Sequence, residues 1–204
     1  KTAMNIGQAR RLCPEAPVVP PRMKAYTTAS RAVYEIFENT SPVVEALSID
    51  EAFLDVRGLE HISGTPAEIA ATLRREVLET VGLNISVGVA RTKFLAKVAS
   101  GACKPDGLLV VNPGAESEFL HPLPIESLWG VGKVTSSKLH SMGINTVGDI
   151  ARCDKVLLVT ALGEHAGRRL IDLANNRHPR QVALRRPRRS TLAKPSAAVS
   201  WERS

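Results

Sequence analysis

Residues 43–56, VVEALSIDEAFLDV, contain two short apolar runs that meet at Ser48-Ile49-Asp50-Glu51. Apolar runs of this length, bounded by polar residues, predict two strands joined by a tight connection. Around them the sequence predicts helices over 2–12, 24–39, 65–81 and 92–102, and strands over 84–90 and 108–111. This mixed order predicts an α+β fold, built from a partial sheet with helices on one face.

The last part of the chain has a different character. From Pro122 onward, proline and glycine separate short helices that are expected over 132–142, 147–153, 155–162 and 164–175, and no strand signal remains. These helices predict a small all-α unit. We expect its boundary with the sheet at about residues 112–124.

The composition excludes several classes of protein. The chain has 204 residues, 44% of them hydrophobic, but no apolar run approaches the roughly 20 residues of a membrane-spanning helix. The three cysteines, Cys13, Cys103 and Cys153, are far apart in sequence and form no CxxC pair, which argues against a disulfide framework and a zinc site. We therefore expect a cytoplasmic protein that does not enter a membrane.

The net charge of +7 is concentrated at the end of the chain. Residues 177–204 hold eight Lys and Arg against the single Glu202, whereas the acidic and basic residues before them cancel. A basic segment after a neutral body indicates a polyanionic partner, most simply nucleic acid. The alternative is a solvated tail without a partner. The arginines expected to bind DNA are Arg185, Arg186, Arg188 and Arg189.

Asp50 and Glu51 are adjacent carboxylates within an apolar stretch. Burial of unpaired carboxylates is costly, so the pair indicates a partner such as Mg²⁺, which prefers a few carboxylates together with phosphate oxygens. Neighbouring strand residues point to opposite faces, so both can bind one metal only if the chain turns there. The alternative is a surface hairpin with exposed acids. Asp55, on the second strand, is expected to pair with an arginine.

A glycine-rich turn precedes the C-terminal helices. Gly130-Val131-Gly132-Lys133 is followed by a predicted helix, a turn at Gly143 and a second helix capped by Thr146. This is the helix-hairpin-helix pattern, in which backbone N–H groups and a helix dipole favour a phosphate. Lys133 and Lys138 would add salt-dependent attraction to DNA. The alternative is an ordinary αα-hairpin.

Three lysines form a further set. Lys93 and Lys97 are four residues apart on one face of a predicted helix, and Lys104 lies in the Pro-Asp-Gly turn that follows. Amines at these positions could neutralise a triphosphate that faces the two acids. Solvated lysines are the alternative for each, and the turn makes Lys104 the strongest candidate.

Four segments occur in this order: SIDEAFLDV (48–56), SVGVARTKFLAKVAS (86–100), KPDG (104–107) and LWGVGKVTSSKLHSMGINTVGDIA (128–151). Together they resemble the Y-family translesion DNA polymerases, and most closely the bacterial DinB, or DNA polymerase IV, branch. The resemblance implies a remnant of the fingers at residues 1–23, an incomplete palm at 24–112, a thumb with the helix-hairpin-helix at 113–176 and a basic linker at 177–204.

The resemblance also implies an activity. A member of this family is a DNA-directed DNA polymerase, a nucleotidyltransferase that extends primer–template DNA with dNTPs during DNA repair and damage tolerance, with a mutator effect. Asp50 and Glu51 would be two of the three carboxylates that hold two Mg²⁺ ions, and Lys104 would contact the triphosphate. Gly130, Val131, Gly132 and Lys133 would hold the DNA backbone. A monomer is implied, together with a sliding clamp whose docking peptide would lie beyond Ser204.

The sequence departs from the family pattern in several places. The family's first metal-binding aspartate and its aromatic steric gate would precede Lys1, and its little-finger domain would follow the linker. We therefore expect the chain by itself to lack polymerase activity and its sheet to have exposed edges. Trp129 replaces the proline that is common before the Gly-Val-Gly loop.

Two other functions remain open at this point. One is a non-catalytic module that holds duplex DNA through the thumb hairpin and the Arg-rich tail. The other is a different two-metal phosphoryl-transfer enzyme, such as a nucleotide cyclase. The helix-hairpin-helix argues against a cyclase, because that activity has no need to hold duplex DNA.

Overall fold

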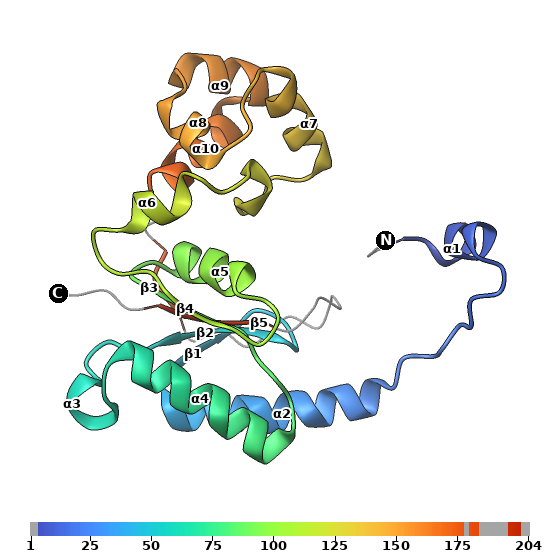
Figure 1. Ribbon diagram of the computed structural model, residues 1–204, viewed down its shortest axis with the longest axis vertical. Coiled ribbons are helices and arrows are strands. Elements are labelled where there is room, and N and C mark those ends of the chain that lie inside the picture. The colour runs from blue at the N-terminus through green and yellow to red at the C-terminus, as the bar shows by residue number, and fades with distance from the viewer. Residues whose placement is uncertain (1–3, 178–179, 184–195, 201–204) are drawn as a thin grey trace.

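The computed structural model describes residues 4–177, 180–183 and 196–200 of the chain, and within them a five-stranded sheet lies between two layers of helices (Figure 1). The strand order is β1-β2-β5-β3-β4. β1 and β2 are antiparallel, whereas β3 is parallel to β4 and to β5. The strands are β1 (Val43–Ala46), β2 (Glu51–Asp55), β3 (Val87–Ala90), β4 (Leu108–Val110) and β5 (Ser196–Ser200).

The two faces of the sheet carry separate buried clusters. Alternation along β2 sends Ala52 and Leu54 into the cluster with α2 (Met23–Thr40) and α4 (Pro66–Val81), and sends Phe53 into the cluster with α5 (Lys93–Ala102). The α+β class is therefore confirmed. The expectation that helices lie on one face is corrected, because α5 covers the face opposite α2 and α4 (Figure 1).

Local sequence explains why α4 and α5 begin and pack where they do. Thr65 and Glu68 form the predicted capping box at the start of α4. The side chain of Thr92 accepts a hydrogen bond from the backbone N–H of Leu95 at the start of α5. A Cβ at Gly88 of β3 would lie 2.1 Å from the carbonyl oxygen of Ala96, so the close approach of α5 to the sheet requires glycine.

Strand β5 was not predicted. The expectation that no strand follows residue 122 is wrong, because Ser196–Ser200 pairs in parallel with both β2 and β3. The segment SAAVS has little intrinsic strand preference, and pairing with two neighbours supplies what its sequence does not. The described sheet thus has its open edges at β1 and β4, and not between β2 and β3.

The C-terminal helices pack on α5 as part of one core. Leu139 and Leu173 belong to the same buried cluster as Phe53 of β2 and Phe94 of α5. Figure 1 shows these helices on the far side of α5 from the sheet. The elements between β4 and β5 are α6 (Glu116–Leu120), a 3₁₀ turn η1 (Ile125–Ser127), α7 (Lys133–Ser141), α8 (Val147–Arg152), α9 (Lys155–Leu162) and α10 (Glu164–Ala174), and the last four match the predicted helices.

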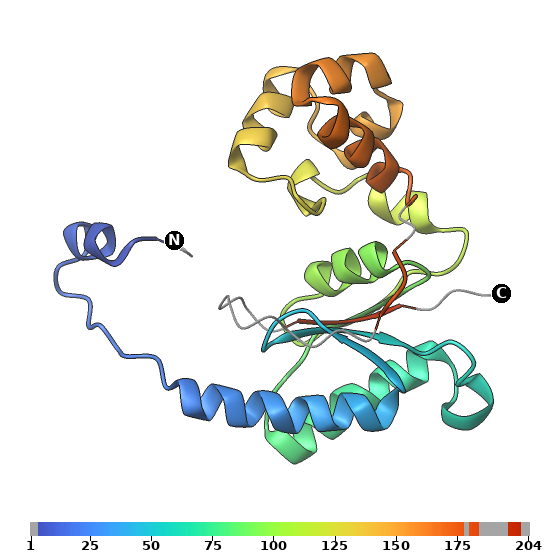
Figure 2. The ribbon, with the colours of Figure 1, turned by 180° about the vertical axis from the view of Figure 1, so that it is seen from behind.

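Two short helices lie outside these layers. Helix α1 (Ile6–Leu12) has no buried residue, and it stands away from the sheet in both views (Figure 2). Helix α3 (Glu60–Ser63) precedes α4. None of the helices in the described part of the chain has the length and apolar character needed to span a bilayer.

Candidate active site

The turn between β1 and β2 presents Asp50 and Glu51. Asp50 lies in the turn, and Glu51 is the first residue of β2, so strand alternation does not force the two carboxylates onto opposite faces. Two side chains of helix α2 form hydrogen bonds to the backbone of this turn. The hydroxyl of Tyr34 lies 2.7 Å from the carbonyl oxygens of Ser48 and Glu51, and the hydroxyl of Ser30 donates to the carbonyl of Ile49.

Asp50 carries a buried oxygen without a donor. Its Oδ1 accepts from the hydroxyl of Ser48, but its Oδ2 is buried and has no hydrogen-bond partner among the described residues. Burial raises the pKa of Asp50, and the charge of Glu51 raises it further, whereas the Ser48 hydrogen bond and the charge of Lys104 lower it. A buried acceptor of this kind is what a bound cation would satisfy.

The same environment acts on Tyr34. Burial and the charges of Asp50 and Glu51 raise the pKa of its hydroxyl, so the O–H remains protonated and available to the two carbonyls. Sequence reasoning missed Ser30 and Tyr34 as supports of the turn. Tyr34 lies within the helix predicted over 24–39, but nothing in its spacing indicates which turn its hydroxyl reaches.

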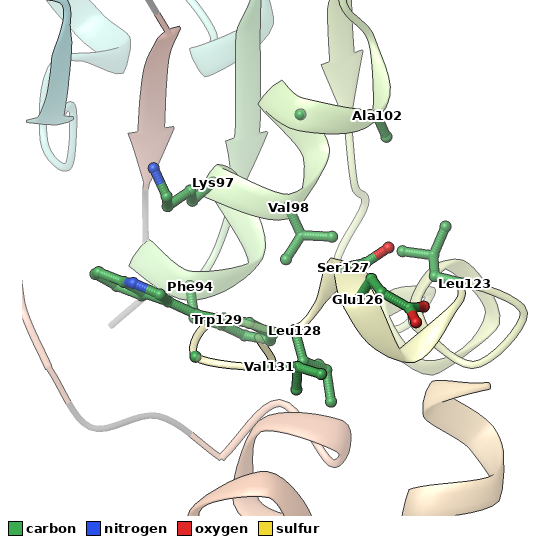
Figure 3. A pocket seen from close by; sticks show the side chains of 12 residues that line it. Phe94, Lys97, Val98, Ala102, Leu123, Glu126, Ser127, Leu128, Trp129 and Val131 are labelled. Carbon is green, nitrogen blue, oxygen red and sulfur yellow. The ribbon is translucent and has the colours of Figure 1, made fainter. Parts of the chain in front are cut away.

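Glu51 is paired with Lys97 of α5. The Nζ of Lys97 lies 2.9 Å from both carboxylate oxygens of Glu51. The same Nζ lies 5.8 Å from the centre of the Trp129 ring, in the loop before α7. Figure 3 shows Lys97 above the extended indole of Trp129 in a cleft between α5 and this loop.

Lys93 has a different role from Lys97. Its ammonium forms a buried ion pair with Glu45 of β1, and both side chains are 7% exposed. The spacing prediction placed Lys93 and Lys97 on one helix face, and the structure shows that Lys93 does not face Asp50 and Glu51. Only the tertiary structure distinguishes the two lysines.

Lys104 is exposed in the turn between α5 and β4. Its positive charge is one of the causes that lower the pKa of Asp50. Arg74 of α4 holds this turn, because its guanidinium binds the carbonyl and a side-chain oxygen of Asp106 at 2.7 Å. Sequence reasoning did not identify Arg74.

The predicted helix-hairpin-helix is formed by α7 and α8. Gly130 has φ +97° and Gly143 has φ +78°, the left-handed conformations that favour glycine. Gly132 caps α7, with open space around its Cα, and Thr146 caps α8 through a capping box with Asp149. Val131 is partly buried against the core, whereas the side chains of Lys133 and Lys138 are exposed.

A polar network braces this hairpin. Glu126 accepts from the hydroxyl of Ser136 and lies 2.9 Å from His140 Nε2, and His140 Nδ1 lies 2.8 Å from Asn145 Oδ1. These hydrogen bonds lower the pKa of Glu126 to about 2, with Ser136 as the largest cause. The bond to Glu126, followed by that to Asn145, raises the pKa of His140.

Asp55 pairs with Arg57, as expected, with Nε 2.9 Å from both carboxylate oxygens. In the part of the chain that the structure describes, no three His, Cys, Asp or Glu side chains gather as metal ligands, so Asp50 and Glu51 stand as a pair. The arginines Arg185, Arg186, Arg188 and Arg189 lie outside the described residues.

Two family models match the chain. The one described as the impB/mucB/samB family matches residues 1–101, and the one described as the IMS family HHH motif matches residues 113–144. The first covers the Asp50–Glu51 turn, and the second covers the Gly130–Lys133 loop and α7.

Curated relatives agree with these matches. A protein named DNA polymerase IV 2 from Mesorhizobium japonicum is 48% identical over 179 residues, which are 88% of this chain and 43% of that protein. A DNA polymerase IV from Pseudomonas fluorescens is 43% identical over 89% of this chain and 51% of that protein. The chain spans about half the length of the curated relatives it matches.

Solved structures show the same architecture. The crystal structure of a DinB family error-prone DNA polymerase from Sulfolobus solfataricus matches with a TM-score of 0.79 and 32% identity, over 89% of this chain and 55% of that one. An insertion ternary complex of Dbh DNA polymerase matches with a TM-score of 0.77 and 32% identity, over 89% of this chain and 53% of that one.

Proposed function

Because the chain belongs to the impB/mucB/samB family, in its DinB branch of Y-family DNA polymerases, we propose that it is the catalytic part of a translesion DNA polymerase. The reaction is the addition of a deoxynucleotide to a primer on a DNA template. The observation that carries the proposal is that Oδ2 of Asp50 is buried and has no hydrogen-bond partner among the described residues. Asp50 is adjacent to Glu51 in the chain, and the charge of Lys104 lowers its pKa. Residues 24–112 then act as the palm and 113–176 as the thumb.

The carboxylates of Asp50 and Glu51 fit a divalent cation. Asp50 offers a buried oxygen that no described donor satisfies, and Glu51 offers a carboxylate whose charge is balanced by Lys97. Magnesium is the proposed ion, because it takes few carboxylates and leaves positions for phosphate oxygens. When bound, it would supply charge stabilisation to phosphoryl transfer between the primer 3′-hydroxyl and the triphosphate.

The chain's own residues bind and orient the reactants. Asp50 is oriented by Ser48, and the turn that carries it is held by Tyr34 and Ser30. The charge of Lys104 lowers the pKa of Asp50, and this lysine would bind the triphosphate of the incoming nucleotide. Fixed groups of this kind lower the cost of bringing primer and nucleotide together.

The loop before α7 would hold the DNA backbone. The first backbone N–H groups of a helix have no intrahelical acceptor, and α7 has no acidic residue in its first turn. Phosphates would therefore bind at Gly130–Lys133, with Lys133 and Lys138 adding attraction that falls with salt. Such contacts position a duplex without reading its sequence, which suits a polymerase.

Further features of the whole protein belong to the same proposal. We place its action in the cytoplasm on chromosomal DNA, as a monomer with a sliding clamp, and we expect error-prone synthesis. Primer–template DNA and dNTPs are its substrates. The solved ternary complexes of Dbh DNA polymerase support the proposed DNA and nucleotide substrates.

The test is primer extension with Mg²⁺ on undamaged DNA by the protein that carries this chain. Asp50→Ala should abolish incorporation, whereas Asp55→Ala, the same change at the last residue of β2, should retain it. Binding to labelled primer–template should survive Asp50→Ala and weaken steeply between low and moderate salt. Incorporation at the wild-type rate by Asp50→Ala would overturn the assignment, and a flat salt response would overturn the proposed mode of DNA binding.

A further inference from the structure

Helix α5 carries two similar clusters, each made of a lysine, a carboxylate and an aromatic ring. Lys93 pairs with Glu45, and its Nζ lies 4.8 Å from the centre of the Phe53 ring. Lys97, one turn later, pairs with Glu51, and its Nζ lies 5.8 Å from the centre of the Trp129 ring. Cations within about 6 Å of a ring centre are attracted to its face.

The two clusters differ in their access to solvent. The side chains of Lys93 and Glu45 are each 7% exposed, and the second oxygen of Glu45 accepts from the backbone N–H of Ala183. The side chains of Lys97 and Glu51 are 27% and 18% exposed. Lys97 also lines a cleft of about 670 Å³ with Trp129 (Figure 3). The first cluster is sealed as part of the core, whereas a ligand can reach the second.

Trp129 joins the loop before α7 to the sheet layer. Its ring centre lies 6.5 Å from that of Phe53, and the residue packs against the shared core. Gly130, the next residue, begins the glycine turn that leads into α7. A change in the position of the Trp129 side chain therefore acts directly on the loop proposed to hold DNA.

We propose that Lys97 and Trp129 form a latch that couples a cation at Asp50 and Glu51 to the position of the loop at residues 129–132. The latch rests on the proposed function, since it assumes that the two carboxylates bind a divalent cation. Lys97 and Trp129 are positioning residues in this device, because Lys97 acts through Glu51 and Trp129 acts through the loop.

The physical basis is competition for Glu51. Without a cation, the ammonium of Lys97 binds both oxygens of this carboxylate. A divalent cation at the same carboxylate repels the ammonium and weakens its bond. The face of Trp129 is the neighbouring group that attracts a displaced ammonium. Such coupling is reciprocal, so DNA that fixes the loop also changes the affinity of the carboxylates for the cation.

The test uses Trp129 emission as a readout that does not depend on catalysis. The sequence has two tryptophans, so Trp201→Phe leaves Trp129 as its one remaining tryptophan. Ca²⁺, an oxygen-binding probe of similar charge, is titrated into this background while its binding is measured independently by calorimetry. We expect a saturable change in Trp129 emission with the same midpoint as the calorimetric curve.

Lys97→Met separates the latch from the cation site. In this variant Ca²⁺ should still bind, about fivefold more tightly because a competing cation is gone, but the emission change should be lost. Lys155→Met, an exposed lysine at the start of α9, is the matched control and should keep both responses.

The outcomes distinguish the two proposals. Calcium binding without an emission change, or an emission change that persists in Lys97→Met, overturns the latch and leaves the proposed function intact. Absence of calcium binding overturns the cation site, and the latch falls with it. Loss of the emission change with retained binding in Lys97→Met, and not in Lys155→Met, supports the latch.

Discussion

The guanidinium of Arg74, on α4, donates hydrogen bonds of 2.7 Å to the carbonyl and to a side-chain oxygen of Asp106, in the turn that carries Lys104. The Nε of the same guanidinium donates to the carbonyl of Ile85, just before β3. Arg74 therefore ties the Lys104 turn to the start of a central strand. Arg74 thus holds the turn that carries the proposed triphosphate-binding lysine.

Replacement of Arg74 should loosen this turn. Arg74→Met removes hydrogen bonds from a charged donor to Ile85 and Asp106, so the free energy of unfolding should fall by about 1–3 kcal/mol. Triphosphate affinity should fall as well, because Lys104 is no longer held. Chemical denaturation and nucleotide titration measure the two effects. Arg75→Met, at the next and exposed position of α4, is the control; an equal loss there would mean that the turn is not held by Arg74.

Substitution of Gly88 should disrupt the contact between β3 and α5. An alanine Cβ there would lie 2.1 Å from the carbonyl oxygen of Ala96 and 2.3 Å from the backbone nitrogen of Ser100. Because both atoms belong to the backbone, Gly88→Ala should cost about 3 kcal/mol or more in thermal or chemical unfolding.

Gly101→Ala is the matched control for Gly88→Ala. It lies in α5 with open space around its Cα, so it should stabilise the chain by about 0.5–1 kcal/mol. Similar stabilities for the two variants would contradict the close packing of β3 against α5.

Neutralisation of Asp50 should stabilise the cation-free protein. Its raised pKa means that the ionised carboxylate disfavours the fold, by an amount that grows as pH rises above the ordinary value of 3.8 and becomes constant above the raised pKa. Asp50→Asn should therefore melt at a higher temperature than the wild type at neutral pH in chelator. Asp55→Asn should melt lower, since it breaks the pair with Arg57. A lower melting temperature for Asp50→Asn would refute this account.

The Glu126–His140 pair should make the stability of the hairpin depend on pH. The pKa of His140 is raised in the fold, so its contribution is complete below the unfolded value of 6.5 and is lost as pH rises through the folded value. Glu126, with its pKa lowered to about 2, contributes above 4.5 and loses that contribution as pH falls toward 2.

His140→Gln should remove the part of the pH dependence of stability that comes from His140. Melting temperatures measured on both sides of pH 6.5 should converge with those of the wild type as pH rises. His165→Gln, an exposed histidine on α10, serves as control. A constant difference between His140→Gln and the wild type across this range would contradict the role of the charged histidine.

Much of the fold follows from local sequence. Thr65 with Glu68 and Thr146 with Asp149 fix the starts of α4 and α8 as capping boxes, because those hydrogen bonds are made within one turn. Apolar periodicity places α2 and the strands β1 and β2 close to where they occur. Strand β5 could not be predicted, because SAAVS becomes a strand only through pairing with β2 and β3.

The sequence by itself determined the candidate chemistry, and the tertiary structure decided how it is arranged. The adjacent acids, the Pro-Asp-Gly turn and the glycine loop can be recognised in the sequence, because each is defined by residues that are neighbours in the chain. Whether Lys93 or Lys97 faces Asp50 and Glu51 depends on which carboxylate each meets across the sheet. These ion pairs, like the hydrogen bonds from Arg74 to Asp106, join residues that are distant in the chain, so only tertiary packing decides them.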